Sequence, residues 1–282
     1  MMLYVVATPI GNLEDITLRA LRVLREVDLV AAEDTRHTRK LLERHDIHTP
    51  LTSYHEHNER TKAPTLVRRL EAGEDIALVS DAGTPTISDP GYHLIRAAAE
   101  KSVPVTPVPG ASAATAALSV CGLATDRFVF QGFLPGRRNR RREMLRQLQG
   151  DDRTMVFYEA PHRIRESLAD MHEVLGDRAA VVGRELTKVH EELLRGTLSQ
   201  LAGELDQQRG EFVVVVAGRG DAPAVDEESL RTEITRLLER GQKANDVAKL
   251  MADSHHVAKR DVYKLVLEVA KGQGPGDDGS GI

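Results

Sequence analysis

The sequence has little of what disulfide-stapled, zinc-ribbon or membrane-spanning proteins depend on. It contains 1 cysteine among 282 residues, which excludes a disulfide framework and a zinc ribbon. Its longest run of apolar and small residues, 111–124, is too short to cross a bilayer and predicts a buried helix instead. No basic segment precedes the first apolar residues, so we expect no signal peptide. These absences favour a soluble protein of the cytoplasm, with no membrane partner.

The signature motifs of several common enzyme classes are also missing. No G-x-G-x-x-G follows a predicted strand, which disfavours an ordinary dinucleotide-binding fold. The absence of G-x-x-x-x-G-K-[ST] argues against a nucleoside triphosphatase, and the absence of G-x-S-x-G argues against a Ser-His-Asp hydrolase. His55 and His57 would share one face of an extended segment. A metal between these histidines stays open as an alternative, although we expect none.

Charge is balanced in total but uneven along the chain. The 38 Lys and Arg residues against 43 Asp and Glu residues give a net charge of −5. Five arginines fall within 137–142, and a second basic group near the C-terminus comprises Lys243, Lys249, Lys259, Arg260 and Lys264. An acidic protein that concentrates positive charge locally favours a polyanionic partner. Solvated helix faces are the alternative interpretation of both groups.

Several apolar runs are continuous, which indicates strands buried on both faces of a parallel or mixed sheet. These runs are 3–7, 29–32, 76–79, 155–158, 179–182 and 212–217. Helical periodicity lies between them, for example after Thr17, which we expect to cap a helix. The alternation of strand and helix patterns predicts an α/β fold.

We expect four segments along the chain. Residues 1–117 form an N-terminal α/β domain and 118–222 a second α/β domain. Residues 227–270 carry three helical patterns and no strand pattern, which suggests a small module resembling a helix-turn-helix. Residues 271–282 are rich in glycine and are expected to be disordered.

Three loops rich in glycine and proline follow predicted strands in the first half of the chain. They cover residues 7–13, 80–91 and 108–113. In open α/β sheets, ligands bind outside the carboxyl ends of the strands, where loops and helix N-termini offer free backbone N–H groups. Each loop alone could be a tight turn, but the three together predict a ligand site.

Six motifs in a fixed order resemble a single family over about residues 3–220. They are T-P-I-G-N-L at 8–13, A-E-D-T-R at 32–36, S-Y-H-E-H-N-E at 53–59, S-D-A-G-T-P at 80–85, F-Y-E-A-P-H-R at 157–163 and R-E-L-T-K at 184–188. Their order and spacing resemble the bacterial small-subunit ribosomal RNA methyltransferases of the RsmI type, within the tetrapyrrole methylase superfamily.

The resemblance implies methylation, dependent on S-adenosylmethionine, of a cytidine ribose 2′-hydroxyl in the decoding centre of 16S ribosomal RNA. It implies two unequal α/β domains with the cofactor in the cleft between them, and a homodimer. By similarity, the cofactor contacts are Pro9, Ala82, Gly83, Thr84, Ile87, Ser112, Ala113, Tyr158 and Glu159. The second loop departs from the GDP-type loop of the corrin- and sirohaem-forming relatives, which points away from a tetrapyrrole substrate.

A general base must remove the hydroxyl proton, and the sequence leaves its identity open. The candidates near the expected cleft are Asp34, His55, His57, Glu159, Glu185 and Lys188. The expected RNA contacts are Arg36, Arg137, Arg138, Arg140, Arg141, Arg142, Lys259 and Arg260. Two other functions remain open, a tetrapyrrole C-methyltransferase acting on precorrin or uroporphyrinogen, and a non-catalytic RNA-binding factor of ribosome assembly.

Overall fold

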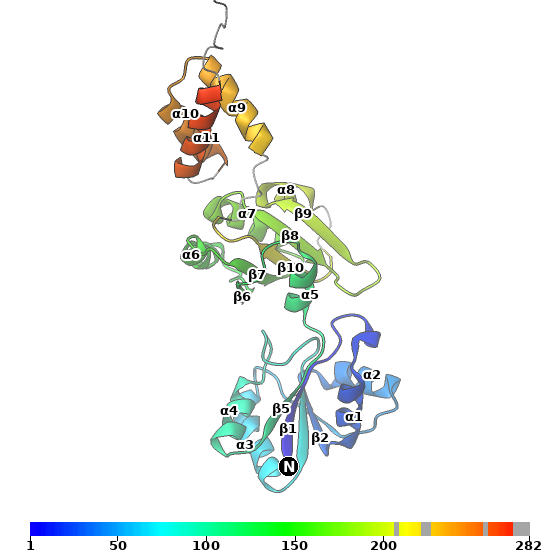
Figure 1. Cartoon of the computed structure of the whole chain (residues 1–282). Helices are drawn as coiled ribbons and strands as arrows, with labels where there is room; N and C mark the ends of the chain where they lie inside the picture. The colour runs from blue at the N-terminus through cyan, green and yellow to red at the C-terminus, as the bar shows by residue number, and fades with distance from the viewer. Residues whose placement is uncertain (206–208, 221–226, 256–258, 273–282) are drawn as a thin grey trace, which may run out of the picture.

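The computed structural model describes residues 1–205, 209–220, 227–255 and 259–272, which form two five-stranded sheets followed by three helices (Figure 1). The first sheet is parallel throughout, with the order β3-β2-β4-β1-β5. Its strands are β1 (Met2–Val6), β2 (Leu29–Ala32), β3 (Leu51–Ser53), β4 (Asp75–Val79) and β5 (Val105–Val108). The predicted α/β fold is therefore confirmed.

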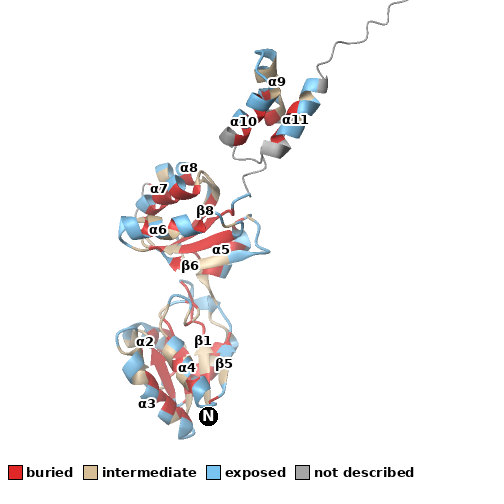
Figure 2. Cartoon of the chain, turned by 90° about the vertical axis from the view of Figure 1, so that its left-hand side faces the viewer, coloured by how far each residue is buried: buried red, intermediate tan, exposed pale blue. Residues whose placement is uncertain are grey.

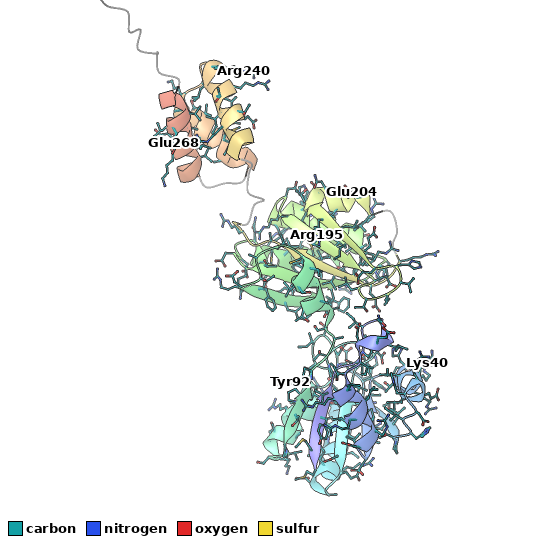
Figure 3. The ribbon with its side chains drawn as sticks, turned by 45° about the vertical axis from the view of Figure 1, so that its right-hand side comes forward. Lys40, Tyr92, Arg195, Glu204, Arg240 and Glu268 are labelled. Carbon is teal, nitrogen blue, oxygen red and sulfur yellow. The ribbon has the colours of Figure 1, made fainter. Side chains whose placement is uncertain are left out.

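Helices cover both faces of the first sheet (Figure 1). They are α1 (Leu18–Glu26), α2 (Thr35–Arg44), α3 (Glu59–Glu71) and α4 (Tyr92–Glu100), with a short 3-10 helix at Leu13–Asp15. The Thr17 hydroxyl accepts a hydrogen bond from the backbone N–H of Ala20 at 3.0 Å, so the predicted cap of α1 is confirmed. Lys40 on α2 and Tyr92 on α4 accordingly lie on opposite sides of this sheet (Figure 3).

The continuous apolar runs are explained by two cores, one on each face of the sheet. Along β2, Leu29 and Ala31 pack with α3 and α4, whereas Val30 and Ala32 pack with α1 and α2. Successive side chains of a strand point to opposite faces, so a strand covered on both sides has no polar position. Every residue of β2 is buried, and Figure 2 shows buried strand segments in the interior of both sheets.

The second sheet is mixed, with the order β6-β7-β10-β8-β9. Strands β6 (Phe128–Phe133) and β7 (Thr154–Glu159) are parallel, and the remaining neighbours are antiparallel. The remaining strands are β8 (Ala179–Arg184), β9 (Glu192–Thr197) and β10 (Phe212–Val216). One core contains the helices α6 (Arg138–Leu148), α7 (Ile164–Leu175) and α8 (Leu198–Glu204).

The other face of the second sheet is covered by α5 (Ala113–Val120), which packs against β7 and β10. Cys121, at the end of this helix, is 2% exposed and behaves as a buried small side chain. The domain boundary expected between residues 117 and 118 falls inside α5. The packing of this helix groups it with the second sheet, so a division before Ala113 follows the cores more closely.

The last part of the chain forms its own small core from α9 (Glu227–Glu239), α10 (Ala244–His255) and α11 (Lys259–Gly272). Figure 3 shows Arg240 on its outer surface, with the side chain directed away from the helices. Of the tail expected to be disordered, 271–272 complete α11 and 273–282 lie outside the described residues. No helix among the described residues has the length and apolarity needed to cross a membrane.

The arginine cluster at 137–142 is not uniformly a surface feature. Arg141 is 1% exposed and lies 2.7 Å from the equally buried carboxylate of Asp170. The expectation that Arg141 contacts RNA is therefore wrong, because its guanidinium is buried and paired with Asp170 inside the protein. Arg138 also binds Asp170, at 3.0 Å, and Arg142 binds Glu173.

Removing the Arg141 side chain should destabilise the second domain, because the Asp170 charge would stay buried without its main partner. We expect Arg141→Ala to lower the free energy of unfolding by roughly 3–5 kcal/mol, measured by urea denaturation. Arg140→Ala, one position earlier on the exposed face of α6, should leave the unfolding curve nearly unchanged. Equal effects of the two variants would contradict a buried ion pair.

Candidate functional site

The three loops predicted from glycine and proline lie together at one edge of the first sheet. Strands β4, β1 and β5 are neighbours and parallel, so their carboxyl ends open at the same edge. Thr8 and Gly83 join the first two loops through paired backbone hydrogen bonds of 2.9 and 3.0 Å. The Thr84 hydroxyl joins the second loop to the third by donating to the Ala111 carbonyl at 3.2 Å.

The second sheet supplies the facing wall. Phe212, the first residue of β10, pairs with Glu159 at the end of β7 and with Arg184 at the end of β8. Strand β6 is parallel to β7 and ends beside it at Phe133. Four strand termini of the second sheet therefore meet at the edge that faces the loops of the first.

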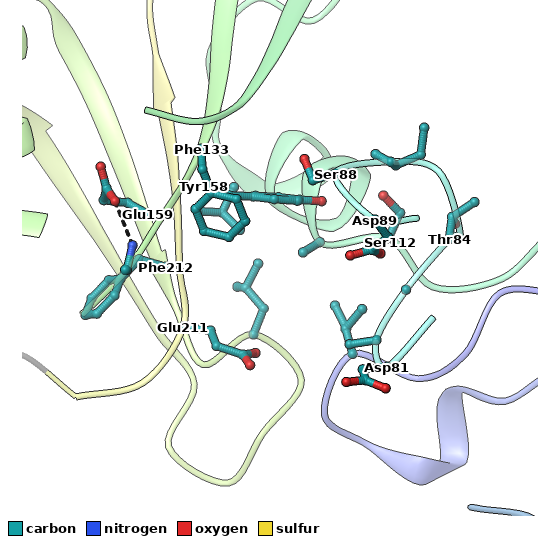
Figure 4. Close-up of a pocket in the computed structure, with 18 of the residues that line it drawn as sticks. Asp81, Thr84, Ser88, Asp89, Ser112, Phe133, Tyr158, Glu159, Glu211 and Phe212 are labelled. Atoms are coloured by element: carbon teal, nitrogen blue, oxygen red, sulfur yellow. Dashed lines mark hydrogen bonds between the residues drawn. The ribbon is translucent and has the colours of Figure 1, made fainter. Parts of the chain in front are cut away.

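A pocket of about 390 Å³ lies between the loops and this wall (Figure 4). Its lining residues are Ile10, Glu33, Asp81, Ala82, Gly83, Thr84, Ile87, Ser88, Asp89, Ser112, Ala113, Phe133, Tyr158, Glu159, Ala160, Pro161, Leu186, Glu211, Phe212 and Val213. Eight of the nine residues expected to contact a cofactor are among them. The ninth, Pro9, does not line the pocket, whereas its neighbour Ile10 does.

The loops at the pocket rim are held in strained conformations. Thr86 and Ser88 in the second loop have φ angles of 74° and 68°, and Glu185 and Thr187 after β8 have φ angles of 48° and 68°. Side chains other than glycine rarely adopt these angles, and such residues cluster at functional sites. The Thr187 hydroxyl also accepts a hydrogen bond from the backbone of Asn12 at 3.2 Å, which ties the β8–β9 loop to the first loop.

A glycine allows the second loop to reach the second sheet. Gly132 in β6 has a φ angle of 66° at a register shift of the strand. A Cβ atom at this position would lie 2.9 Å from the Oγ atom of Ser88. Glycine is therefore required both by the backbone conformation and by the close approach of the loop.

The pocket is acidic. Its charged lining residues are all carboxylates, namely Glu33, Asp81, Asp89, Glu159 and Glu211. Among the described residues that line it, none is lysine, arginine or histidine. A pocket lining that contains carboxylates and no basic side chain favours a cationic ligand and disfavours one that carries several phosphates.

Glu159 is fixed by its own domain. It is 2% exposed, and its carboxylate accepts hydrogen bonds from the backbone of Ala160, the Arg163 guanidinium and the Ser167 hydroxyl. With both oxygens occupied, Glu159 can shape the pocket and contribute its charge. It is poorly placed to take up a proton.

Asp89 is a lining carboxylate whose acidity is strongly altered by its surroundings. Burial, and next the negative charge of Glu33, raise the pKa of Asp89 to about 7, although a hydrogen bond with Ser80 opposes this effect. Asp89 is not among the site residues expected from the sequence. The sequence indicates only that Asp89 lies in the second glycine- and proline-rich loop. Glu33, the residue whose charge raises the pKa of Asp89, follows a different strand and comes close only in the folded protein.

Of the six candidate bases drawn from the sequence, only Glu159 lines the pocket. Asp34 caps α2, and the hydrogen bond from the Arg36 side chain lowers the pKa of Asp34 to about 2. Glu185 lies 2.9 Å from the Lys188 ammonium. Burial raises the pKa of Glu185, but hydrogen bonds from Lys188 and from the Glu211 backbone outweigh it and leave the pKa below its ordinary value.

The two histidines lie together but away from the pocket lining. The ring centroids of His55 and His57 are 6.0 Å apart in an edge arrangement. The Nε2 atom of His55 lies 3.0 Å from the side-chain nitrogen of Asn58, just before α3. Within the described ranges, no group of three metal-ligating side chains includes these histidines.

The residues expected to bind RNA are spread over separate surfaces. Arg36 is exposed but forms an ion pair of 2.8 Å with Asp34. Arg137 and Arg140 are exposed, and in the described part of the chain neither forms an ion pair. Lys259 and Arg260 belong to α11, but their side chains lie outside the described structure.

The raised pKa of Asp89 predicts a pH-dependent contribution to stability. Its folded-state pKa of about 7 lies above the ordinary 3.8, so the folded protein holds a proton that the unfolded chain releases. Stability from this group is complete below about 3.8 and is lost as pH rises through about 7. In calorimetry, the melting temperature of Asp89→Asn should therefore exceed that of the wild type at pH 8, and the difference should shrink toward pH 4. A difference in melting temperature that does not depend on pH would contradict this prediction.

Comparison with known proteins gives the relationship of the chain. Residues 2–202 match the family of tetrapyrrole (corrin/porphyrin) methylases. The ribosomal RNA small subunit methyltransferase I of Pseudomonas aeruginosa is 51% identical over 274 residues, which cover 94% of this chain and 96% of that protein. The protein of the same name from Synechocystis sp. is 47% identical over 95% of this chain and 98% of that protein.

Solved structures show the same fold at low sequence identity. A diphthine synthase is 18% identical with a TM-score of 0.59, over 78% of this chain and 90% of that one. The uroporphyrin-III-C-methyltransferase of Thermus thermophilus is 20% identical with a TM-score of 0.54, over 77% of this chain and 94% of that one. The chain therefore belongs to the tetrapyrrole methylase family and, within it, to the S-adenosylmethionine-dependent methyltransferases of the ribosomal RNA small subunit methyltransferase I group.

Proposed function

We propose that the chain methylates small-subunit ribosomal RNA and that S-adenosylmethionine binds in the pocket between the two sheets. The observation that carries the proposal is a pocket built from three strand-end loops and lined by five carboxylates without a basic side chain. A sulfonium cofactor with an ammonium group suits such a pocket. A nucleoside triphosphate or dinucleotide would place its phosphates against those carboxylates.

The residues present fit this cofactor. Ile10, Leu186 and Val213 offer apolar surface, and the loops around Gly83 and Ser112 offer backbone groups for hydrogen bonding. The Gly83 φ angle of 82° leaves the backbone of the second loop free of a side chain at the turn. When bound, the cofactor supplies an activated methyl group.

The finer proposal is that the acceptor is the 2′-hydroxyl of a cytidine in the decoding centre of 16S ribosomal RNA. The chain must then align the hydroxyl oxygen with the methyl carbon, exclude water and take up the hydroxyl proton. Hydrogen bonds hold the pocket walls in place before the substrate binds. They join Thr8 to Gly83 and Thr84 to Ala111. Preorganisation of this kind is what an in-line transfer requires.

A transfer assay tests the function directly. The full chain, radiolabelled S-adenosylmethionine and assembled small subunits should give label on a cytidine ribose, located by nuclease digestion and mass spectrometry. Gly83→Val is the matched inactive variant, because valine at a φ angle of 82° distorts the loop and should lower cofactor affinity at least tenfold in calorimetry.

The outcomes separate the levels of the proposal. Label on a base instead of a ribose would remove the 2′-hydroxyl proposal and leave the RNA methyltransferase. Label on uroporphyrinogen or precorrin but not on subunits would favour the tetrapyrrole enzyme. Cofactor and RNA binding without any transfer would favour a non-catalytic assembly factor.

Substrate binding is proposed to use basic side chains outside the pocket. Arg137 and Arg140 are the members of the arginine cluster that stay exposed and without an ion pair in the described structure. The helical module of residues 227–270 contributes the exposed Lys243 and Lys249. We propose that this module binds RNA and takes no part in the methyl transfer. On the family resemblance we also propose a homodimer that works in the cytoplasm.

The arginine cluster makes a quantitative prediction about salt. Replacing both Arg137 and Arg140 by alanine should weaken RNA binding and flatten the slope of log K against log salt by about 1.4–1.8, since each lost phosphate contact removes about 0.7–0.9. Filter binding at several salt concentrations measures this slope. Arg142→Ala is the control, because Arg142 is already paired with Glu173 and should change the slope less. Identical slopes for all three proteins would assign the cluster to ordinary solvated surface.

A further inference from the structure

We propose that Asp89 is the base that accepts the proton of the acceptor hydroxyl, an inference that rests on the methyl transfer proposed above. Asp89 lines the pocket, in the loop that follows β4. This assignment replaces the candidates drawn from the sequence, all of which lie outside the pocket lining except Glu159.

The other lining carboxylates are already engaged. The carboxylate of Glu159 is held by Ala160, Arg163 and Ser167. Asp81 accepts from the backbone N–H of Asp34 at 2.9 Å, and Glu33 accepts from the backbone N–H of Asp81 at 3.2 Å. These donors hold the three carboxylates in place. Burial raises the pKa of Glu33, although the hydrogen bond from the Asp81 backbone opposes this effect.

Glu211 is engaged as well, and it lies at the rim. Its side chain is 73% exposed, and one of its oxygens lies 3.0 Å from the Lys188 ammonium. An exposed carboxylate that is paired with an ammonium group is poorly placed to receive a proton inside the pocket. Asp89 has the Ser80 hydroxyl as its hydrogen-bond partner and forms no ion pair within the described chain.

The loop that carries Asp89 is fixed at both ends and against the second sheet. Ser88, the preceding residue, has a φ angle of 68° and lies against Gly132 of β6. The backbone N–H of Gly91 lies 3.4 Å from the carboxylate of Glu59 on α3. A base on a rigid support keeps a constant position relative to the acceptor, which proton transfer within a reacting complex requires.

The groups that face Asp89 set its proton affinity. Glu33 after β2 and Asp81 after β4 place negative charge beside it, and Tyr158 of β7 faces it from the second sheet. Figure 4 shows the Tyr158 hydroxyl directed toward the side of the pocket on which Ser88 and Asp89 lie. With no basic group among the lining residues, burial and then the negative charges around Asp89 hold its pKa near neutrality, which suits a base working at neutral pH.

The proposed step balances. The O–H bond of the acceptor hydroxyl breaks, and its proton passes to a carboxylate oxygen of Asp89. The hydroxyl oxygen forms a bond to the methyl carbon of S-adenosylmethionine, while the carbon–sulfur bond breaks and its electron pair stays on sulfur. One negative and one positive charge are consumed together, and the proton later leaves Asp89 for water.

The test compares Asp89→Asn with Asp81→Asn, a second lining carboxylate from the same loop. In the transfer assay on small subunits, Asp89→Asn should lower kcat by about 10²–10⁴-fold. Its affinity for S-adenosylhomocysteine, measured by calorimetry, should change less than fivefold. The wild-type kcat/KM should rise with pH to a plateau with an inflection near 7. Asp81→Asn should keep an inflection but move it to lower pH, because it removes a negative charge beside Asp89, whereas Asp89→Asn should lose the inflection.

A readout without turnover completes the test. In the ligand-free wild type, carbon-13 NMR of the Asp89 carboxyl should titrate near pH 7, and the signal should move to lower pH when S-adenosylmethionine binds, because a cation favours the ionised form. If Asp89→Asn does not fold, Asp89→Glu takes its place. It should keep the pH-dependent rise at a rate reduced about tenfold or more.

Three results would overturn the assignment. They are a kcat of Asp89→Asn within tenfold of the wild type, a loss of cofactor affinity as large as its loss of activity, and a pH-independent rate in Asp89→Glu. The failure of the proposed function looks different. In that case the wild type itself transfers no methyl group to the subunit, whatever the Asp89 carboxyl shows by NMR.

Discussion

The pairing of Thr8 with Gly83 is the interaction on which the site depends. Two backbone hydrogen bonds join loops that are 75 residues apart in the sequence, and the buried Thr8 hydroxyl adds a third to the Ser80 carbonyl at 3.1 Å. The parallel sheet makes this possible, because it places the ends of β1 and β4 side by side. Gly83 adopts the left-handed φ angle at which the second loop turns toward the first. The sheet topology therefore brings the two loops of the pocket floor together, and the backbone pairing of Thr8 with Gly83 joins them.

The loops at the seam between the two α/β units adopt strained backbone conformations. Ser88 packs on Gly132, and the Asn12 backbone bonds the Thr187 hydroxyl, so two loops of the first unit touch the second unit on either side of the pocket. Thr86, Ser88, Glu185 and Thr187 adopt left-handed φ angles in these contact loops. Each such residue costs about 1–3 kcal/mol, which the cores of the two units must outweigh. Rigidity at the seam thus comes from the packing of the domains themselves.

Much of this architecture could be predicted from the sequence, because buried strands leave continuous apolar runs and strand-end loops leave glycine and proline. The missed strands were short or lay at an edge. β3 has three residues, β5 contains the exposed Pro107, and β9 contains the exposed Glu192 and Arg195. The identity of the base and the burial of Arg141 could not be predicted. Each depends on residues that folding brings together. Glu33 and Asp81 lie beside Asp89, and Asp170 lies beside Arg141.

The distribution of charge joins the proposed cofactor to the proposed substrate. Carboxylates such as Asp81 and Asp89 attract a cation into the pocket but repel the phosphates of an RNA strand. A polyanion can approach such a pocket only if basic side chains outside it offset this repulsion, and the exposed Arg137 and Arg140 stand at the start of α6, next to the β6 edge of the wall. The ribose hydroxyls and the bases of an RNA strand are neutral. An acidic pocket can therefore admit a single nucleoside while the flanking phosphates stay on the basic surface.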